Sequence, residues 1–291
     1  MKLSGKVAVV TGASMGIGEA IAKRFVAEGA AVALTSRDLA RAEAARQRIC
    51  AAETKPISGP DQKLGDAAER TFALACDVRR RSDLENLLRQ TVERFRRVDI
   101  WVNNAGHGLL DSVAKMSMAE CRAMFDTNLF GVVEAMQIVI PQMQRQGGGT
   151  VANISSVAGH IAVPGMAAYC ATKAALNAIG KAARVELQKT GVQVMTVCPG
   201  YIQTDFALNA VKGADRQRIS AAARGISPDR VAAAVLNGYL RNKREVVVPA
   251  QDRLLIKLYQ AWPQLMEWGM ARMLRPADQV IAEQQARKLG H

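Results

Sequence analysis

The chain has 291 residues, of which 49% are hydrophobic and 22% are charged. This composition is unlike that of disordered chains, and the length is sufficient for a large core without disulfides. Its 39 basic and 26 acidic side chains leave a net charge of +13, which suits an anionic partner (a phosphorylated small molecule, an acidic lipid surface or nucleic acid) or simply an arginine-rich surface. The five cysteines are scattered without a CxxC pair, and neither a secretory signal nor an apolar run of about 18 residues is visible, so we expect reduced thiols, no membrane span and a cytoplasmic location.

Seven short aliphatic runs alternate with longer helical patterns along the chain. The runs are continuous rather than alternating, which indicates strands buried on both faces, and the helices between them indicate right-handed crossovers in a parallel sheet. We predict an α/β fold: a single Rossmann-type, doubly wound parallel sheet of about seven strands flanked by helices, over residues 1–250. The predicted strands are 6–11, 31–35, 71–76, 99–102, 150–154, 193–197 and 244–248, and the predicted helices are 19–28, 39–52, 82–95, 119–143 and 168–190.

Two stretches depart from this alternation. Residues 52–69 combine proline and glycine with little apolar periodicity, so we expect a surface insertion or flexible loop. Residues 251–291 form a C-terminal apolar helical extension, which Pro263 should divide into two helices. Its wide apolar face must be covered by its own domain, a second copy or a membrane surface, or serve as a substrate lid. A narrow polar stripe bounds that face: Arg253, Lys257, Gln260, Gln264, Glu267 and Ala271.

A glycine-rich loop joins the first predicted strand directly to the first helix. Its glycines have the spacing Gly-xxx-Gly-x-Gly. Glycine lets the backbone approach a pyrophosphate closely, and the free N–H groups of the following helix attract its negative charge. A tight turn alone would also use glycine, but the order of strand, loop and helix favours a dinucleotide site. The residues assigned to it are Gly12, Ser14, Met15, Gly16, Ile17 and Gly18.

A tyrosine and a lysine are positioned for proton exchange in the last predicted helix. Tyr169 and Lys173 are four residues apart, so they share one helical face. A neighbouring ammonium favours the phenolate and should lower the pKa of the tyrosine from about 10. Ser155 and Ser156 follow the fifth predicted strand, where a hydroxyl can bind a carbonyl oxygen. The Tyr-xxx-Lys pair alone is common and equally fits a solvated helix face.

Together these motifs resemble the classical short-chain dehydrogenase/reductase family, whose glycine motif is TGxxxGxG. The resemblance covers roughly residues 6–206 and includes an NNAG motif at 103–106. It implies that Tyr169 exchanges the proton and that Ser156, 13 residues earlier, orients the substrate oxygen in preference to Ser155. It further implies that Lys173 lowers the tyrosine pKa and holds the nicotinamide ribose. Asn128 is implied to bind a relay water through its backbone carbonyl.

The resemblance also implies how a nicotinamide dinucleotide is held. Asp77, with Val78 beside it, would contact the adenine, and the NNAG residues would line the adenosine ribose and the cofactor channel. The Pro-Gly step after the sixth strand begins the segment that meets the nicotinamide carboxamide. As bare residues, Asp77 and Asn103 could equally be turn residues at strand ends. The implied contacts are Asp77, Val78, Asn104, Ala105, Gly106, Tyr169, Lys173, Pro199, Gly200, Ile202 and Thr204.

The end of the second predicted strand bears on the choice between NAD and NADP. Ser36 occupies the position where NAD-preferring relatives carry aspartate, and Arg37 follows it. A guanidinium can pair with a 2′-phosphate, which an aspartate would repel. We therefore predict NADP(H) as the cofactor. Met15 departs from the pattern, because NADP-preferring relatives often carry a basic residue there.

These features predict an NADP(H)-dependent oxidoreductase that transfers a hydride between the nicotinamide and a carbonyl or secondary alcohol. The expected substrate-side residues are mostly apolar, which favours a lipid-, acyl- or steroid-like substrate: His160, Ile161, Val163, Met166, Tyr201 and Phe206. The alternative is a non-catalytic, cofactor-binding regulator or scaffold. We expect no metal and no nucleic acid, since no aromatic stacking platform accompanies the arginine clusters. A dimer or tetramer and peripheral membrane contact through the extension are further expectations.

Overall fold

The computed structural model describes residues 1–53, 66–204, 206, 210–212 and 225–273. Most of the insertion predicted at 52–69 lies outside these described residues. The main feature is a seven-stranded, wholly parallel sheet in the order β3-β2-β1-β4-β6-β7-β9. The strands are β1 (Val7–Val10), β2 (Ala31–Ser36), β3 (Thr71–Ala75), β4 (Ile100–Asn103), β6 (Gly149–Ile154), β7 (Val192–Pro199) and β9 (Glu245–Val248).

The strand order reverses between β1 and β4, which pair directly through Val9 and Trp101. Chain connections run outward in opposite directions from this point, so a crevice forms outside the carboxyl ends of the two strands. The glycine-rich loop leaves β1 at this edge. The predicted fold class and seven strands are therefore confirmed, and the topology itself indicates where a ligand binds.

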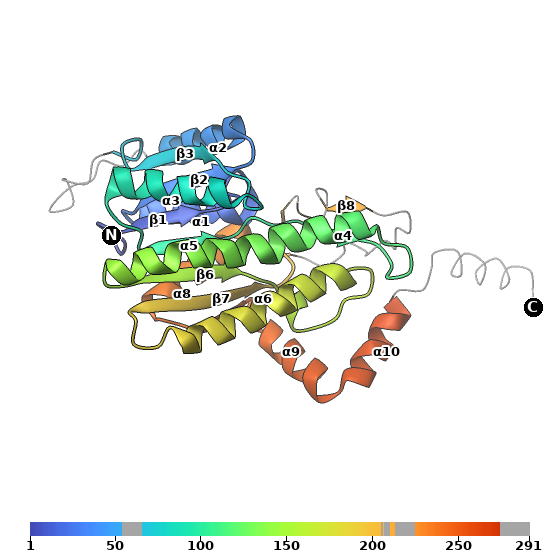
Figure 1. The fold of residues 1–291 in the computed structure, drawn as a ribbon. Helices are drawn as coiled ribbons and strands as arrows, with labels where there is room; N and C mark the ends of the chain where they lie inside the picture. Colours follow the sequence, from blue (N-terminus) through green and yellow to red (C-terminus); the bar gives the residue numbers. More distant parts are fainter. Residues whose placement is uncertain (54–65, 205, 207–209, 213–224, 274–291) are drawn as a thin grey trace, which may run out of the picture.

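Helices cover both faces of the sheet (Figure 1). One face carries α1 (Gly16–Ala27), α2 (Leu39–Ala52) and α8 (Pro228–Leu240); the other carries α3 (Arg81–Phe95), α5 (Gly131–Arg145) and α6 (Ala167–Glu186). The alternation of side chains along each strand divides the core in two. Ala8 and Val10 of β1 pack toward α1 and α8, whereas Val9 packs with the helices of the opposite face.

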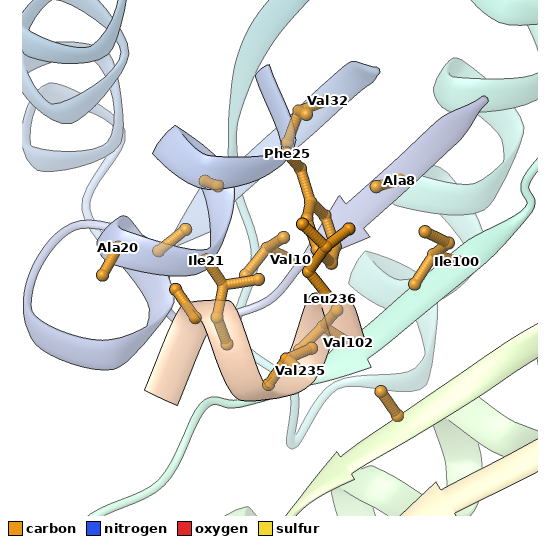
Figure 2. Close-up of a cluster of buried hydrophobic side chains, with 14 of the residues drawn as sticks. Ala8, Val10, Ala20, Ile21, Phe25, Val32, Ile100, Val102, Val235 and Leu236 are labelled. Carbon is orange, nitrogen blue, oxygen red and sulfur yellow. The ribbon is translucent and has the colours of Figure 1, made fainter. Parts of the chain in front are cut away.

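The first of these two cores is held by large aliphatic and aromatic side chains. Figure 2 shows Phe25 and Ile21 of α1 and Leu236 of α8 clustered around Val10 and Val102 of the sheet. Phe25 and Ile21 are fully buried. Each such side chain contributes about 1.5–3 kcal/mol through burial, so this contact fixes α1, and with it the glycine loop, on the sheet.

The long helix predicted at 119–143 is continuous but contains a π-helical turn. It consists of α4 (Met118–Phe125), η2 (Asp126–Phe130) and α5. Its full length, Met118–Arg145, is long and apolar enough to cross a membrane by composition, with 44% of the tested window buried. Val132 and Val139 of this helix pack into the sheet core. We interpret it as a core helix.

Several elements were absent from the sequence prediction. They are α8, the short helix η3 (Val157–Gly159), and a separate two-stranded parallel sheet of β5 (Leu109–Leu110) and β8 (Val211–Lys212). The two strands of that small sheet contribute two residues each and come from distant parts of the chain. Their pairing depends on tertiary contact, which local periodicity does not encode.

The C-terminal extension forms two helices, α9 (Asp252–Ala261) and α10 (Pro263–Met273), which meet at Pro263 as predicted. Ile256 of α9 is buried against the domain, whereas α10 packs mainly on α9 among the described elements. The pair projects as a V below α6 (Figure 1). Its outward apolar side chains are 54–63% exposed: Leu254, Trp262, Leu265 and Trp268.

Candidate active site

The glycine loop is packed so tightly that side chains would not fit. Gly12 and Gly16 have φ values of +62° and +59°, which glycine adopts without strain. A Cβ atom on Gly12 would lie 2.8 Å from the Cα of Ala105. A Cβ atom on Gly18 would overlap the Asn104 amide and the Gly12 carbonyl. These glycines leave a bare backbone cradle at the N-terminus of α1, which fits a pyrophosphate.

Thr11 and Asn104 hold this loop to the end of β4. The Thr11 hydroxyl donates to Val102 O at 3.2 Å and accepts from the backbone N–H groups of Asn104 and Ala105 at 3.0 and 3.1 Å. The Asn104 amide donates to the carbonyls of Thr11 and Gly12, both at 2.9 Å. Asn104, which is expected to contact the ribose, therefore also holds the glycine loop to the end of β4. No role for Thr11 was predicted from the sequence, although this residue begins the glycine motif.

Asn103 is a structural residue of the sheet. Its buried amide accepts from the Trp101 indole and donates to Asn153 Oδ1, both at 2.8 Å. These bonds join β4 to β6 in the interior. Of the two asparagines in the NNAG motif, only Asn104 faces the glycine loop.

The remaining predicted cofactor residues lie near the same sheet edge or contact it. Met15 is the N-cap of α1 and is 43% exposed. Ile17 is partly buried against the core. The backbone carbonyl of Ser14 accepts a hydrogen bond from the Arg48 guanidinium at 3.1 Å. Val78 is buried, and a Cβ on Gly106 would lie 2.9 Å from Asn128 Oδ1. Thr204 approaches Gly16, whose Cβ would lie 3.4 Å from the Thr204 methyl. The carboxyl end of β7 thereby meets the glycine loop.

The adenine side carries several charged groups. Arg79 binds both Asp77 carboxylate oxygens, and this hydrogen bonding lowers the pKa of Asp77. The positive charge of Arg37 makes a smaller contribution in the same direction. Ser36 accepts the Asp38 N–H at 3.3 Å, while the Asp38 carboxylate caps α2. Asp77, implied to bind adenine, is engaged by Arg79 in this structure.

Asn128 lies at the centre of the π-helical turn η2 and is fully buried. Its amide oxygen accepts the His107 N–H at 3.0 Å, and its amide nitrogen donates to His107 O at 2.9 Å and to Thr172 Oγ1 at 3.3 Å. Asparagine is unfavourable inside a helix, and these bonds explain its presence. π-turns often occur at functional sites because they shift backbone groups out of the helical pattern. Asn128 thus connects the NNAG segment to α6.

The two serines after β6 point to different partners. Ser155 is buried and donates to Lys173 O at 3.2 Å, so it anchors the middle of α6. Ser156 donates to Pro199 O at 3.3 Å and accepts the Ala158 N–H at 3.1 Å. Burial raises the pKa of Tyr169, and the nearby Ser156 hydroxyl acts in the opposite direction with a smaller effect. The geometry brings Ser156 to the tyrosine and leaves Ser155 in a supporting position.

Tyr169 and Lys173 lie on one face of α6, both buried, with the Lys173 Nζ 5.7 Å from the centre of the tyrosine ring. Burial raises the pKa of Tyr169 to about 12 and lowers the pKa of Lys173 to about 8. The sequence predicts that the lysine lowers the tyrosine pKa, whereas in the structure the net pKa of the tyrosine is raised. The Lys173 ammonium donates to Ile154 O at 2.9 Å, and burial deprives the phenolate of water.

His107 is a site residue that the sequence analysis missed. Burial lowers its pKa, and the charges of Arg37, Arg79 and Lys173 act in the same direction. Its backbone N–H and carbonyl are both hydrogen-bonded to the Asn128 amide, which fixes this segment beside the π-helical turn. Its position directly after the NNAG motif is the signal that would have identified it. The charges around it make this edge of the sheet attractive to an anion.

The substrate side of Tyr169 is apolar. Tyr169 belongs to a buried cluster with Leu109, Met124 and Ala168, and the Phe206 ring lies 5.4 Å from it, centre to centre. Met166 packs on this cluster, and the Val163 N–H donates to Cys170 Sγ at 3.3 Å. His160 and Ile161 lie on the other side, against the end of β7 and α9. Tyr201 is 47% exposed.

Comparison with known proteins finds relatives among the short chain dehydrogenases. A model of the short chain dehydrogenase family matches residues 6–215. The chain is 33% identical over 278 residues to the ketoacyl reductase HetN of Nostoc, covering 94% of this chain and 89% of that protein. A metagenomic short-chain oxidoreductase in complex with NADP is similar in structure, with a TM-score of 0.67, 32% identity, and coverage of 85% of this chain and 98% of that one.

A short chain dehydrogenase/reductase from Burkholderia phymatum in complex with NAD shares the fold, with a TM-score of 0.76, 22% identity, and coverage of 91% of this chain and 96% of that one. The site and these comparisons define a Rossmann-type oxidoreductase of the nicotinamide-dependent kind. The chain belongs to the short-chain dehydrogenase/reductase family.

Proposed function

We propose that the protein is an NADP(H)-dependent reductase of apolar carbonyl compounds, which also catalyses the reverse oxidation of the corresponding alcohols. The observation that carries this proposal is the convergence of Ser156, Tyr169 and Lys173 at the sheet edge that also presents the glycine cradle. A regulator that only bound a cofactor would have no physical need for a buried phenol and a buried ammonium together, because burying polar groups costs free energy.

The proton chemistry would be supplied by Tyr169, Ser156 and Lys173. The Tyr169 phenol, with its pKa raised to about 12, remains protonated at neutral pH and is suited to donate a proton to a developing alkoxide. Ser156 orients the carbonyl oxygen toward that phenol. Lys173, held by Ile154 O, supplies a positive charge behind the tyrosine and a hydrogen bond donor for the ribose. When bound, the nicotinamide supplies the hydride.

The preference for NADP(H) is supported by charge on the adenine side. Ser36 leaves the end of β2 without a carboxylate, Arg37 follows it directly in the chain, and Arg79 pairs with Asp77. Two guanidinium groups in this position attract a 2′-phosphate, and Arg79 also offsets the charge of Asp77. The NADP bound to the metagenomic relative is consistent with this choice.

The apolar substrate is supported by the cluster around Tyr169. Leu109 and Met124 are buried beside the phenol, and the neighbouring Phe206 ring is 36% exposed, so an apolar carbonyl compound would bury part of that ring on binding. The ketoacyl reductase relative is named for a substrate of this character. The first candidate substrates are therefore ketones that carry acyl chains and other lipid-like ketones.

We further propose that the extension rests on an anionic membrane surface. Trp262, Leu265 and Trp268 are more than half exposed, and the Arg272 guanidinium lies 3.7 Å above the Trp268 ring. Tryptophan beside basic side chains is favourable at the headgroup level of a bilayer. Co-sedimentation with vesicles that contain phosphatidylserine tests this. Loss of binding in Trp262→Ser/Trp268→Ser is expected, and a dimer that buries these residues in solution would contradict it.

The decisive test of the enzyme proposal is NADPH oxidation measured against ketones and aldehydes graded from short and polar to long and apolar. We expect turnover to rise with apolar size, and Tyr169→Phe to lower it at least about a hundredfold while NADPH still binds. Tyr259→Phe is the matched control, because that tyrosine lies in α9, outside the residues assigned to the reaction or to either ligand. Equal turnover in Tyr169→Phe and the parent would contradict the mechanism. NADPH binding without turnover on any substrate would favour the regulator.

A further inference from the structure

Behind the catalytic serine, three side chains with metal-binding atoms converge. They are His160, which follows η3, Cys198 near the end of β7, and Glu245 at the start of β9. The His160 Nε2 atom lies 3.5 Å from Cys198 Sγ and 3.4 Å from Glu245 Oε2. All three ligand atoms lie within 4.8 Å of one another. The reaction proposed above gives none of these three residues a task.

The distances match the edges of a tetrahedral zinc site. Zinc binds sulfur at about 2.3 Å, imidazole nitrogen at about 2.0–2.1 Å and carboxylate oxygen at about 2.0–2.2 Å. Tetrahedral geometry then places nitrogen about 3.6 Å from sulfur and about 3.4 Å from oxygen. The two separations from His160 Nε2 agree with these values. The side chains are thus already spaced for one ion.

A catalytic relay of cysteine, histidine and glutamate does not fit the same geometry. Such a relay needs one imidazole nitrogen for the thiol and the other for the carboxylate. Here a single nitrogen, Nε2, faces both groups. Cys198 is also fully buried, so no substrate can reach its thiol as a nucleophile. Three ligands that face one point are instead the arrangement that a metal ion requires.

Asn177 provides a second, independent observation. It is 4% exposed, and its amide nitrogen has no hydrogen-bond partner in the described structure. Its amide oxygen lies 3.9 Å from Cys198 Sγ. Rotating the amide by 180° directs an N–H at the sulfur, and the assignment of the two amide atoms follows the bonds they make. A metal-bound thiolate is the acceptor that would satisfy this buried donor.

We propose that His160, Cys198 and Glu245 bind one Zn²⁺ ion, with water as the fourth ligand and Asn177 as a hydrogen-bond donor to the thiolate. The ion would join η3, β7 and β9 beside the Ser156–Pro199 contact. It would therefore stabilise the segments that position the catalytic serine. It takes no part in the hydride or proton transfer.

Metal binding itself is the test, so it is independent of the catalytic activity. The full chain, freed of metal by chelator and dialysis, is titrated with Zn²⁺ by calorimetry and with Co²⁺ by absorbance. We expect one equivalent of each ion to bind and Co²⁺ to give a sulfur-to-metal charge-transfer band in the near ultraviolet. Cys198→Ala should abolish that band. Glu245→Gln should weaken Zn²⁺ binding at least about tenfold and remove the increase in Tm that Zn²⁺ gives the parent.

The controls separate this site from adventitious binding. Cys76→Ala removes another buried thiol, at the end of β3, and should bind both ions as the parent does. Glu245 is only partly buried, so Glu245→Gln keeps the test informative even where Cys198→Ala does not fold. Less than stoichiometric Zn²⁺ binding, a charge-transfer band that survives Cys198→Ala, or equal affinity in Glu245→Gln would each overturn the proposal. The His160–Glu245 contact would then be an ion pair alone.

Discussion

The cofactor side and the substrate side of the active-site edge differ in how they are built. On the cofactor side, the glycine loop and the NNAG segment meet through backbone atoms and two short side chains, Thr11 and Asn104. On the substrate side, Tyr169 is surrounded by side chains from several segments far apart in the chain, among them Leu109 and Phe206. The first side is a fixed shape, whereas the second is a set of apolar contacts.

This difference has consequences for substitution. Backbone packed against backbone cannot adjust to an added methyl group, so changes on the cofactor side should be severe and independent of the substrate. Apolar side chains can rearrange around ligands of different shape, so changes on the substrate side should be mild and should depend on the substrate. Four measurements, from the largest expected effect to the smallest, test this contrast.

Lys173 lies where the cofactor side and the substrate side meet. Its burial should make the free energy of unfolding depend on pH. Its pKa is lowered from 10.5 to about 8, so between these values the unfolded chain binds more protons and stability rises with pH. The contribution is about 3 kcal/mol. Urea unfolding from pH 7.5 to 10.5 should show this rise in the parent relative to Lys173→Met. Lys181→Met, an exposed charge deletion on the same helix, should follow the parent. Parallel curves for the parent and Lys173→Met would mean that the lysine is hydrated.

Gly18→Ala tests the fixed shape of the cofactor side. The added methyl group would overlap the Asn104 amide and the Gly12 carbonyl, so the loop must shift away from β4. We expect the Kd for NADPH, measured by fluorescence, to rise about a hundredfold, which corresponds to about 2.7 kcal/mol. Gly269→Ala is the matched control, because nothing lies within 4 Å of its Cβ position. Unchanged affinity in Gly18→Ala would show that the loop adapts as the substrate side does.

Arg37→Ala tests whether the cofactor side binds the 2′-phosphate that distinguishes NADP(H) from NAD(H). A lost charge-assisted contact to the 2′-phosphate should raise the KM for NADPH about tenfold and leave the KM for NADH nearly unchanged. Arg41→Ala removes another exposed arginine, one that pairs with Asp38, and should change neither value. Equal effects on the two cofactors would remove the basis for assigning NADP(H).

Phe206→Ala should give the smallest change and the only one that depends on the substrate. The Phe206 and Tyr169 rings are tilted by 58°, an edge-to-face type of contact. Removing the ring should raise the KM for long apolar ketones about threefold and leave short polar ketones unaffected. A uniform effect on all substrates would show that Phe206 supports Tyr169 instead of lining the substrate side.

The same contrast explains what the sequence could predict. The alternation of aliphatic runs with helical patterns is a local pattern and predicts the sheet, and the glycine spacing, the NNAG segment and the Tyr169–Lys173 pair are local patterns that predict the site. The pairing of β5 with β8 and the meeting of His160, Cys198 and Glu245 join residues 38 to 102 positions apart, which no periodicity records. The raised pKa of Tyr169 could not be predicted because its main cause is burial, which only the fold reveals.

The bracing of the glycine loop by Thr11 and Asn104 has a thermodynamic consequence. Five hydrogen bonds that involve no ligand already fix the loop conformation in the protein described here. A dinucleotide therefore meets a preorganised receptor, and its binding loses little backbone entropy at this point. The contacts made by the pyrophosphate can then appear as affinity instead of being offset by the ordering of the chain.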